Sequence, residues 1–359
     1  MRISTITLYR FSLPLIRPYK LALGDVEAFD TVLCIAENRD GSLGFGEATI
    51  LTGYTPETIE ESWRIAGDLA RCTAGRDTAE AKDAIAAEHA TAPFTSTAVM
   101  TAVEMLEGHS TLKVTERTEV PLLAILNATG KDAITEEIEA RLNEGYATLK
   151  VKVGFDAEDD LARVTFIQDK LGGRALIRLD GNQGYNVEDA LRFATGLKPV
   201  GIELFEQPCP ADDWDAASTV AKAAPVPMML DESIYGPDDI DRAADLGAAK
   251  YIKLKLMKAG SLDALAKGLK QIRDRGMTPV LGNGVASDPG CWMEACVARN
   301  LVDNAGEMNG FLKPQAGLFA NPLAMVRGSM ALNPGLPILM PPDQLSALAV
   351  DTLTISGKA

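Results

Sequence analysis

Several residue types on which common functional sites depend are scarce in this sequence. Histidine occurs only twice in 359 residues, as His89 and His109 in the N-terminal third. A histidine-rich metal site or a Ser-His-Asp triad is therefore not favoured. The cysteines are odd in number and show no CxxC spacing, which predicts free thiols in a reducing compartment and neither a disulfide framework nor a zinc site. They are Cys34, Cys72, Cys209, Cys291 and Cys296.

Other absences exclude whole classes of partner. Positive charge is not in excess, since the formal net charge is −15, and this argues against a nucleic acid or an anionic membrane as partner. No apolar run reaches about 18 residues, the length of a membrane span, and residues 1–5 do not begin a signal peptide. We therefore expect a cytoplasmic protein. Neither GxGxxG nor GxxxxGK[ST] occurs, so a nucleotide-binding phosphate loop is not indicated.

The N-terminal third combines strand and helix patterns. Residues 1–50 alternate between apolar and polar positions as antiparallel strands do, and residues 57–110 are helical and rich in alanine and glutamate. Between the first strands, residues 16–25 are predicted to form a mobile loop. Residues 51–57 are predicted to form a second loop that leads into a helix.

From residue 120 a regular alternation of short apolar segments and helical patterns begins. The predicted strands are 120–126, 148–153, 176–179, 201–205, 227–230, 251–256, 278–281 and 305–308. Strand–helix repeats of this kind imply parallel β/α units, and eight of them indicate a closed barrel. A doubly wound open sheet is the alternative, although that fold usually carries a glycine-rich phosphate loop.

The strand at 148–153 carries two lysines, Lys150 and Lys152, one residue apart. Side chains at i and i+2 share a face of a strand, so both ammonium groups point the same way. A solvated edge strand explains this pattern equally well when the segment is taken alone. Polar residues at the ends of later strands favour a shared site, because the active sites of such barrels lie at those ends.

Three carboxylates, Asp180, Glu206 and Asp231, end three consecutive predicted strands. Converging carboxylates repel one another unless a cation lies among them, and Mg²⁺ prefers such hard oxygen ligands. Lysines at 150 and 152 and at 253 and 255 flank the acids on two further strands. A nearby divalent cation and a second lysine are expected to lower the pKa of a lysine and make it a usable base. This set suits abstraction of a proton alpha to a carboxylate; the competing interpretation is that each acid merely caps a helix.

These residues resemble the enolase superfamily and, within it, the muconate lactonizing enzyme subgroup. The resemblance is carried by K-x-K at 150–152, D-x-N at 180–182, D-E-S at 231–233 and K-L-K-L-M-K-A-G at 253–260. It implies an α/β fold with a modified (β/α)7β TIM-like barrel at residues 119–325. It also implies an N-terminal α+β capping domain at residues 1–118 and a C-terminal segment at 326–359 that returns to the cap.

The resemblance assigns roles by position. Lys152 matches the catalytic base and Lys255 the catalytic lysine on the opposite face of the substrate. The expected Mg²⁺ ligands, with Mn²⁺ as the alternative ion, are Asp180, Glu206 and Asp231. The expected supporting residues are Lys150, Asn182, Glu232 and Glu307. Substrate specificity is expected from capping loops near residues 21–30 and 51–54 and from the eighth strand, that is, from Tyr19, Leu23, Tyr54 and Asn309.

Two features narrow the comparison within the superfamily. The mandelate racemase and acid-sugar dehydratase groups use a histidine on strand seven, and no histidine follows His109. Dipeptide epimerases carry D-x-D on strand eight to hold the substrate's α-ammonium, whereas Glu307 and Asn309 stand there in this chain. This chain therefore has one negative charge fewer than the dipeptide epimerases at these positions, which weakens a dipeptide interpretation. A glutamate at position 307 is closer to the muconate cycloisomerases.

Three hypotheses follow. The first is a Mg²⁺-dependent isomerase that racemises or epimerises an N-substituted amino acid or a dipeptide through an enediolate. The second is a muconate-type cycloisomerase or a syn-dehydratase or lyase on the same scaffold, and the same residues would serve it. The third is a non-catalytic protein that binds a small acid. The partner in each case is a small-molecule carboxylate, and self-association into a homo-oligomer is the usual expectation for such enzymes.

Overall fold

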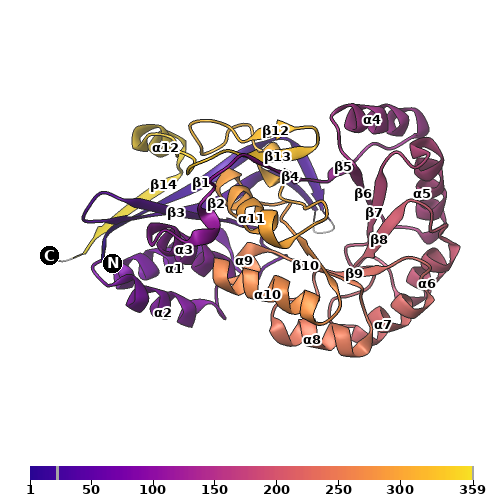
Figure 1. The fold of residues 1–359 in the computed structure, drawn as a ribbon, viewed down its shortest axis with the longest axis horizontal. Helices are drawn as coiled ribbons and strands as arrows, with labels where there is room; N and C mark the ends of the chain where they lie inside the picture. The colour runs from indigo at the N-terminus through magenta and orange to yellow at the C-terminus, as the bar shows by residue number, and fades with distance from the viewer. Residues whose placement is uncertain (22–23, 358–359) are drawn as a thin grey trace.

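The fold has two parts, a sheet-and-helix cap and a parallel barrel (Figure 1). The computed structural model describes residues 1–21 and 24–357. In the view of Figure 1 the cap lies at the left with both chain termini, and the barrel strands with their outer helices lie at the right. No helix among the described residues is long and apolar enough to cross a bilayer.

The cap is a four-stranded antiparallel sheet covered by three helices. Its strand order is β14-β1-β2-β3, with β1 (Ile3–Leu21), β2 (Gly24–Asn38), β3 (Leu43–Ile50) and β14 (Asp351–Ser356). The helices are α1 (Ile59–Thr73), α2 (Thr78–Glu88) and α3 (Pro93–Leu106). Helix α3 lies very close to β3, because a Cβ at Gly44 or Gly46 would come within 2.1 Å of a carbonyl oxygen of α3. These two glycines, on one face of the strand, let the backbones approach.

The predicted loop at residues 16–25 is wrong for the residues that the structure describes. The chain continues as strand to Leu21 and resumes at Gly24, so that β1 and β2 form a long hairpin in which Tyr19 pairs with Val26. The register shifts between Pro14 and Tyr19. Proline in this stretch therefore accompanies an irregularity within a strand rather than a loop.

The barrel sheet contains seven parallel strands in the order β11-β10-β9-β8-β7-β6-β5. They are β5 (Ala124–Leu126), β6 (Thr148–Lys152), β7 (Leu176–Asp180), β8 (Ile202–Glu206), β9 (Met228–Leu230), β10 (Tyr251–Leu254) and β11 (Thr278–Leu281). The helices between and after them are α4 (Lys131–Asn143), α5 (Ala157–Leu171), α6 (Val187–Gly196), α7 (Trp214–Ala223), α8 (Pro237–Leu246), α9 (Leu256–Ala259), α10 (Leu262–Asp274) and α11 (Asp288–Leu301). The alternating strands and helices confirm the predicted barrel.

The eighth predicted strand is reduced to a short bridging segment that closes the ring. Gly306 exchanges backbone hydrogen bonds of 2.9 Å with Pro121 and Leu123 on one side, and the Glu307 amide donates to the Leu281 carbonyl at 3.0 Å on the other. The segment therefore joins β11 to the start of β5. The chain then turns into a short 3₁₀ helix, η2 (Gly310–Leu312), which limits the strand to these few bonds.

The rest of the chain joins the two parts. The first half of the predicted strand 120–126 is a separate strand, β4 (Thr118–Pro121), in a three-stranded sheet with β12 (Ala324–Val326) and β13 (Ser329–Leu332). A 3₁₀ helix, η1 (Ser110–Leu112), precedes it, and α12 (Pro342–Leu348) precedes β14. Strand β14 pairs with β1, so the end of the chain lies against the cap.

Candidate active site

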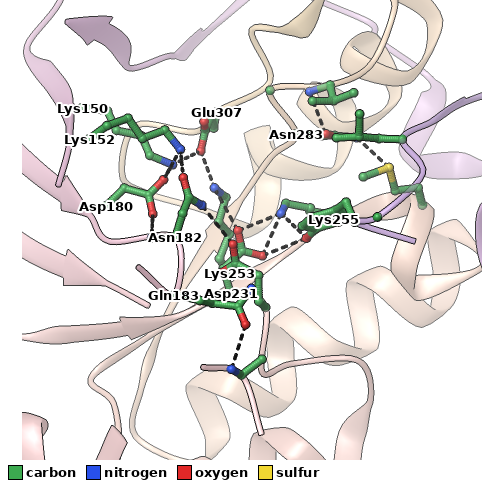
Figure 2. A pocket seen from close by; sticks show the side chains of 18 of the residues that line it. Lys150, Lys152, Asp180, Asn182, Gln183, Asp231, Lys253, Lys255, Asn283 and Glu307 are labelled. Atoms are coloured by element: carbon green, nitrogen blue, oxygen red, sulfur yellow. Dashed lines mark hydrogen bonds and ion pairs between the residues drawn. The ribbon is translucent and has the colours of Figure 1, made fainter. Parts of the chain in front are cut away.

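A pocket of about 300 Å³ opens between the cap and the carboxyl ends of the barrel strands. Its polar lining comes from β6, β7 and β10, from residues that follow β7, β9, β10 and β11, and from Glu307 of the closing segment. Two tyrosines of the cap, Tyr19 and Tyr54, also line it. Figure 2 shows the lysines and acids pointing toward one another across this space. The topology thus gathers residues from 19 to 307 into one polar cluster.

The lysines of β6 point into the barrel. Strand β6 lies between β5 and β7, so the alternative of a solvated edge strand is excluded. The Lys150 ammonium is 2.7 Å from Asp180, 2.9 Å from Glu206 and 2.8 Å from Glu307. Lys152 lies nearer the pocket, where its ammonium is 2.6 Å from Asp180 and contacts the Asn182 side-chain oxygen.

The lysines of β10 approach the same acids from the other side. The Lys253 ammonium is 3.0 Å from Glu206 and 3.4 Å from Asp231, and it also contacts Glu307. Strand β10 ends at Leu254, two residues before the predicted end, and Lys255 stands at the turn into α9. Its ammonium lies 2.8 and 2.7 Å from the two Asp231 oxygens and contacts the Tyr54 hydroxyl.

The acids are aligned by the register of neighbouring strands. Lys152 pairs with Asp180 across β6 and β7, and Asp180 with Glu206 across β7 and β8. Gln207, which the sequence analysis did not single out, connects the end of β8 to the end of β9. Its buried side chain accepts from the Asp231 amide at 3.1 Å and donates to the Ser233 hydroxyl at 2.9 Å.

The loop after β6 is held by Asp160 of α5. Its carboxylate accepts hydrogen bonds from the amides of Gly154 and Phe155, each at 3.0 Å, and from the Tyr185 hydroxyl at 2.7 Å. Gly154 has a φ of +102°, and a Cβ there would lie 2.3 Å from the Gly181 carbonyl. The strand ends that carry Lys152 and Asp180 are thereby locked together.

The donor set fits a divalent cation. Asp180, Glu206 and Asp231 supply hard carboxylate oxygens on three consecutive strands, and the neighbouring Glu232 has a buried oxygen, Oε2, without a hydrogen-bond partner. Lysine ammonium groups lie among these carboxylates. Within the described residues, a group of three or more ligand atoms from histidine, cysteine or acidic side chains, all within 4.8 Å of one another, occurs only at Glu104, His109 and Asp263.

That second group lies outside the pocket and has a structural explanation. Glu104 accepts a hydrogen bond of 2.8 Å from the Leu262 amide at the start of α10, and His109 is 3.0 Å from Asp263, which is exposed. An acid at a helix N-terminus is stabilised by the unpaired amides there. The group thus connects the cap helix α3 to a barrel helix.

The pKa values follow from burial and from the ion pairs. Burial raises the pKa of Asp180, but Lys150 and Lys152 outweigh it and lower the pKa to about 2. Burial lowers the pKa of Lys152, but Asp180 outweighs it and the net shift is upward. The lowered lysine pKa predicted from the sequence is therefore not produced by these contacts and would require a cation to neutralise the acids.

The predicted specificity residues differ in what they contact. The Tyr54 hydroxyl donates to Asp231 at 3.3 Å, and the Lys255 ammonium lies 4.4 Å from the centre of its ring. The Asn309 amide donates to the Leu123 carbonyl at 3.2 Å and accepts from Lys313 at 3.3 Å. Leu23 lies outside the described residues.

Two lysines to which the resemblance assigned no catalytic or supporting role belong to the cluster, Lys253 and Lys258. The Lys258 ammonium lies 4.0 Å from the centre of the Tyr235 ring, and burial lowers its pKa to about 8. The repeat of K-x-K on β10 was a signal for Lys253, because i and i+2 share a strand face. Lys258 follows the strand and lies in α9, where strand periodicity does not predict the direction in which its side chain points.

Comparisons with known proteins agree with this arrangement. Residues 133–343 match the family model described as enolase C-terminal domain-like. Muconate cycloisomerase 1 of Rhodococcus opacus is 28% identical over 374 residues, which cover 95% of each chain. The crystal structure of N-succinyl Arg/Lys racemase from Bacillus cereus superposes with a TM-score of 0.88 at 25% identity, covering 99% of this chain and 100% of that one. A dipeptide epimerase from Cytophaga hutchinsonii, complexed with Mg and D-Ala-L-Val, shares the fold with a TM-score of 0.87 at 20% identity over 99% and 100% of the chains.

Proposed function

Because the chain belongs to the enolase C-terminal domain-like family, in the muconate lactonizing enzyme subgroup, and is an isomerase, we propose that it is a Mg²⁺-dependent racemase or epimerase. The proposed substrate is an N-substituted amino acid, and the configuration that changes is that of its alpha carbon. The observation that carries the proposal is the position of Lys152 and Lys255. They enter the pocket from β6 and β10, with the acids between them (Figure 2). Two amines so placed suit removal of a proton from one face and its return to the other.

We assign the metal to Asp180, Glu206 and Asp231. A bound Mg²⁺ would supply Lewis acidity that stabilises negative charge on a substrate carboxylate. Support comes from the oxygen donor set and from the Mg-bound dipeptide epimerase of the same fold. Mn²⁺ offers the same coordination preference for oxygen and is the alternative ion.

The residues of the chain then divide the proton chemistry. Lys152, in its neutral amine form, takes the alpha proton of one enantiomer onto Nζ and becomes an ammonium, and Lys255, as an ammonium, delivers a proton to the opposite face and becomes a neutral amine. Asn182 contacts Lys152 and donates to Glu232 at 3.0 Å, so it orients the first lysine. Tyr54 contacts Lys255 and orients the second. The Tyr54 hydroxyl stays protonated, because burial raises its pKa well above the usual value.

An N-substituted amino acid suits the pocket better than a free dipeptide. Binding of an α-ammonium group needs an unpaired acid, but Glu307 is buried and already contacts Lys150 and Lys253. Those lysines hold the pKa of Glu307 well below its usual range, against the effect of burial. Asn309 is neutral and contacts another cation, Lys313.

A cycloisomerase is the second candidate, and the extent of the match favours it. Muconate cycloisomerase 1 aligns along 95% of its own length, including the cap. Such a reaction needs one lysine to move a proton while the other stabilises charge. A syn-dehydratase or lyase would make the same use of the two lysines.

The deciding experiment follows alpha-proton exchange and optical rotation in D₂O with Mg²⁺. The panel contains N-acyl amino acids, dipeptides and muconate. Exchange together with loss of optical rotation for N-acyl amino acids is expected. Consumption of muconate without exchange-linked racemisation would instead assign the cycloisomerase, and exchange confined to dipeptides would contradict the choice of substrate.

A further inference from the structure

Glu294 of α11 is a buried acid that the proposed reaction does not use. Its side chain is 1% exposed, and Oε1 accepts a hydrogen bond of 2.8 Å from the Leu256 amide. Leu256 directly follows Lys255, which stands at the turn from β10 into α9. The carboxyl group of Glu294 therefore holds the backbone at the peptide bond between Lys255 and Leu256.

The turn that carries Lys255 is short and depends on bonds from outside. Strand β10 ends at Leu254, and α9 contains only four residues, Leu256–Ala259. The first amides of a helix have no acceptor within that helix, so the buried Leu256 amide needs one from another element. Glu294 supplies this acceptor. Its loss would leave a buried donor unpaired, which costs about 1–3 kcal/mol.

Glu294 lies behind the wall of the pocket on the side of Lys255. It lines a small cavity of about 10 Å³ together with Met257 and Asn283, and these two residues also line the catalytic pocket. The Asn283 amide donates to the Met257 sulfur at 3.0 Å (Figure 2). Glu294 itself does not line the pocket, so any effect on the reaction passes through the residues that it holds.

Helix α11 is fixed in turn by a second buried acid, Glu47 of β3 in the cap. The Glu47 carboxylate accepts from the Gly290 amide at 3.0 Å and from the Ser287 amide at 3.3 Å. Gly290 precedes Glu294 by about one helical turn. A Cβ at Gly290 would lie 2.4 Å from Oε2 of Glu47, so glycine makes this approach possible. The cap thereby fixes the helix from which Glu294 reaches the Lys255 turn.

The other lysine of the proposed pair has a parallel arrangement. Asp160 of α5 accepts from the amides of Gly154 and Phe155, which follow Lys152 closely at the end of β6. At both strand ends a buried acid on a helix bonds to backbone amides just after the lysine. The two acids thus act on opposite sides of the pocket, and each is next to one lysine.

We propose that Glu294 is a positioning residue for Lys255, and that its bond to the Leu256 amide directs the ammonium group toward the alpha carbon. The inference rests on the proposed function and concerns the Lys255 face alone. Burial raises the pKa of Glu294 to about 8, so its side chain is mostly neutral near neutral pH. Glutamine therefore matches it in size and keeps the acceptor, whereas methionine keeps the size and removes the acceptor.

The test compares Glu294→Met with Glu294→Gln by enantiomer-specific exchange of the alpha proton. The enantiomer served by Lys255 is the one that still exchanges in Lys152→Ala. In Glu294→Met, kcat for this enantiomer is expected to fall by about 10- to 100-fold with little change in KM, because a displaced catalytic group slows the reaction and leaves binding intact. Glu294→Gln should restore most of the rate. Exchange of the other enantiomer should stay near the wild-type rate in both variants.

Asp288→Leu is the matched control. Asp288 is a buried acid on the same helix, and it accepts from the amides of Leu318 and Phe319 at 2.7–2.9 Å, away from the pocket lining. This variant should not distinguish the two enantiomers. An equal loss for both enantiomers in Glu294→Met, or an equal loss in Glu294→Met and Glu294→Gln, would contradict the role of Glu294 while the racemase remains.

A second variant breaks the same bond from its other end. Leu256→Pro removes the amide hydrogen, and proline is tolerated at the first position of a helix. The residue before it, Lys255, already has the extended backbone that proline requires of its neighbour. The same loss on the Lys255 face is expected, and exchange at the wild-type rate on that face would contradict the proposal. Melting temperatures show whether each variant is folded.

Failure of the proposed function has a different signature. If the wild-type protein exchanges the alpha proton of no N-substituted amino acid, the proposed function fails, and crystal structures of the variants then test Glu294 without a substrate. Lys255 should keep its contacts with Asp231 and Tyr54 in Glu294→Gln and lose at least one of them in Glu294→Met. Unchanged contacts in Glu294→Met would overturn the inference.

Discussion

At the scale of single residues, the site depends on a lysine and a carboxylate reaching one another from different strands. Lys152 meets Asp180 from the adjacent strand, and Lys255 meets Asp231 from the other side of the pocket. The motif residues that carry these contacts were predictable, because the ends of parallel strands face one opening. The contacts of Lys258 were not, since Lys258 follows β10 in α9, where the strand period no longer applies.

Tyr54→Phe tests whether the tyrosine hydroxyl orients Lys255. The ring would stay in place near Phe94, whose ring centre is 6.3 Å away, so the melting temperature should change little. Proton transfer on the Lys255 face should fall by about tenfold, since a misplaced acid–base group loses part of a contribution of 10²–10⁴. Exchange rates of the two enantiomers, measured separately, report each face. The control is Tyr235→Phe, and an equal loss for both enantiomers in Tyr54→Phe would contradict a role specific to Lys255.

Glu294 gives a pH-dependent prediction outside the chemistry. Burial raises its pKa to about 8, and one carboxyl oxygen, Oε2, has no hydrogen-bond partner. A folded-state pKa above the unfolded value means that the folded form holds a proton which the unfolded form has lost. The free energy of unfolding should therefore decline as pH rises from about 4.5 to about 8.

Glu294→Gln mimics the protonated side chain and removes that decline. The variant should gain melting temperature over the wild-type protein at pH 8, and the gain should shrink toward pH 5. Thermal melts across this range give the measurement. A difference between variant and wild type that does not depend on pH would show that Glu294 does not titrate in this way.

At the scale of elements, the segment between β3 and α1 brings Tyr54 to the pocket. Glu57 anchors it to the start of α3, where its carboxylate accepts from the amides of Phe94 at 2.8 Å and Thr95 at 3.0 Å. The Thr95 hydroxyl adds a bond of 2.5 Å. The N-terminus of α3, whose unpaired amides favour a negative charge, thereby fixes a wall of the pocket.

Glu57→Gln should loosen this wall. An amide NH₂ would face a backbone donor, which costs about 1–3 kcal/mol. The melting temperature is expected to fall, and KM to rise more than kcat declines, because Tyr54 lines the pocket. Glu80→Gln on the exposed face of α2 is the control. An unchanged KM would show that the segment holds its place without Glu57.

The sequence predicted the elements well where the pattern was periodic. Strands β6 to β9 lie within a residue or two of the predicted segments, because their apolar runs are bounded by helices with clear caps. The prediction of a mobile loop failed at residues 16–21 and 24–25, which belong to the paired strands β1 and β2. The eighth strand was overestimated. Among the described residues Gly306 bonds to Pro121 and Leu123 on one side and Glu307 bonds to Leu281 on the other, and the apolar pattern does not show that the pairing is this short.

At the scale of the whole molecule, the proposed metal contributes to the stability of the folded protein. A ligand that binds only the folded state stabilises it by about 2.7 kcal/mol at one hundred times its dissociation constant. Adding Mg²⁺ to chelator-treated protein should therefore raise the melting temperature, and Asp231→Asn should reduce the Mg²⁺-dependent increase. The comparison uses the Mg²⁺-dependent increase and not the melting temperature itself, because Asp231→Asn also removes the ion-pair partner of Lys255 and can change stability without Mg²⁺. An equal increase in both proteins would remove Asp231 from the proposed ligand set.

The most direct measurement of the central claim is enantiomer-specific exchange in the two lysine variants. Lys152→Ala and Lys255→Ala should each abolish racemisation and leave the melting transition cooperative. Each variant should still exchange the alpha proton of the one enantiomer whose proton faces the remaining lysine, and the two variants should select opposite enantiomers. Loss of exchange for both enantiomers in both variants, or the same selectivity in each, would contradict chemistry with one lysine on each face.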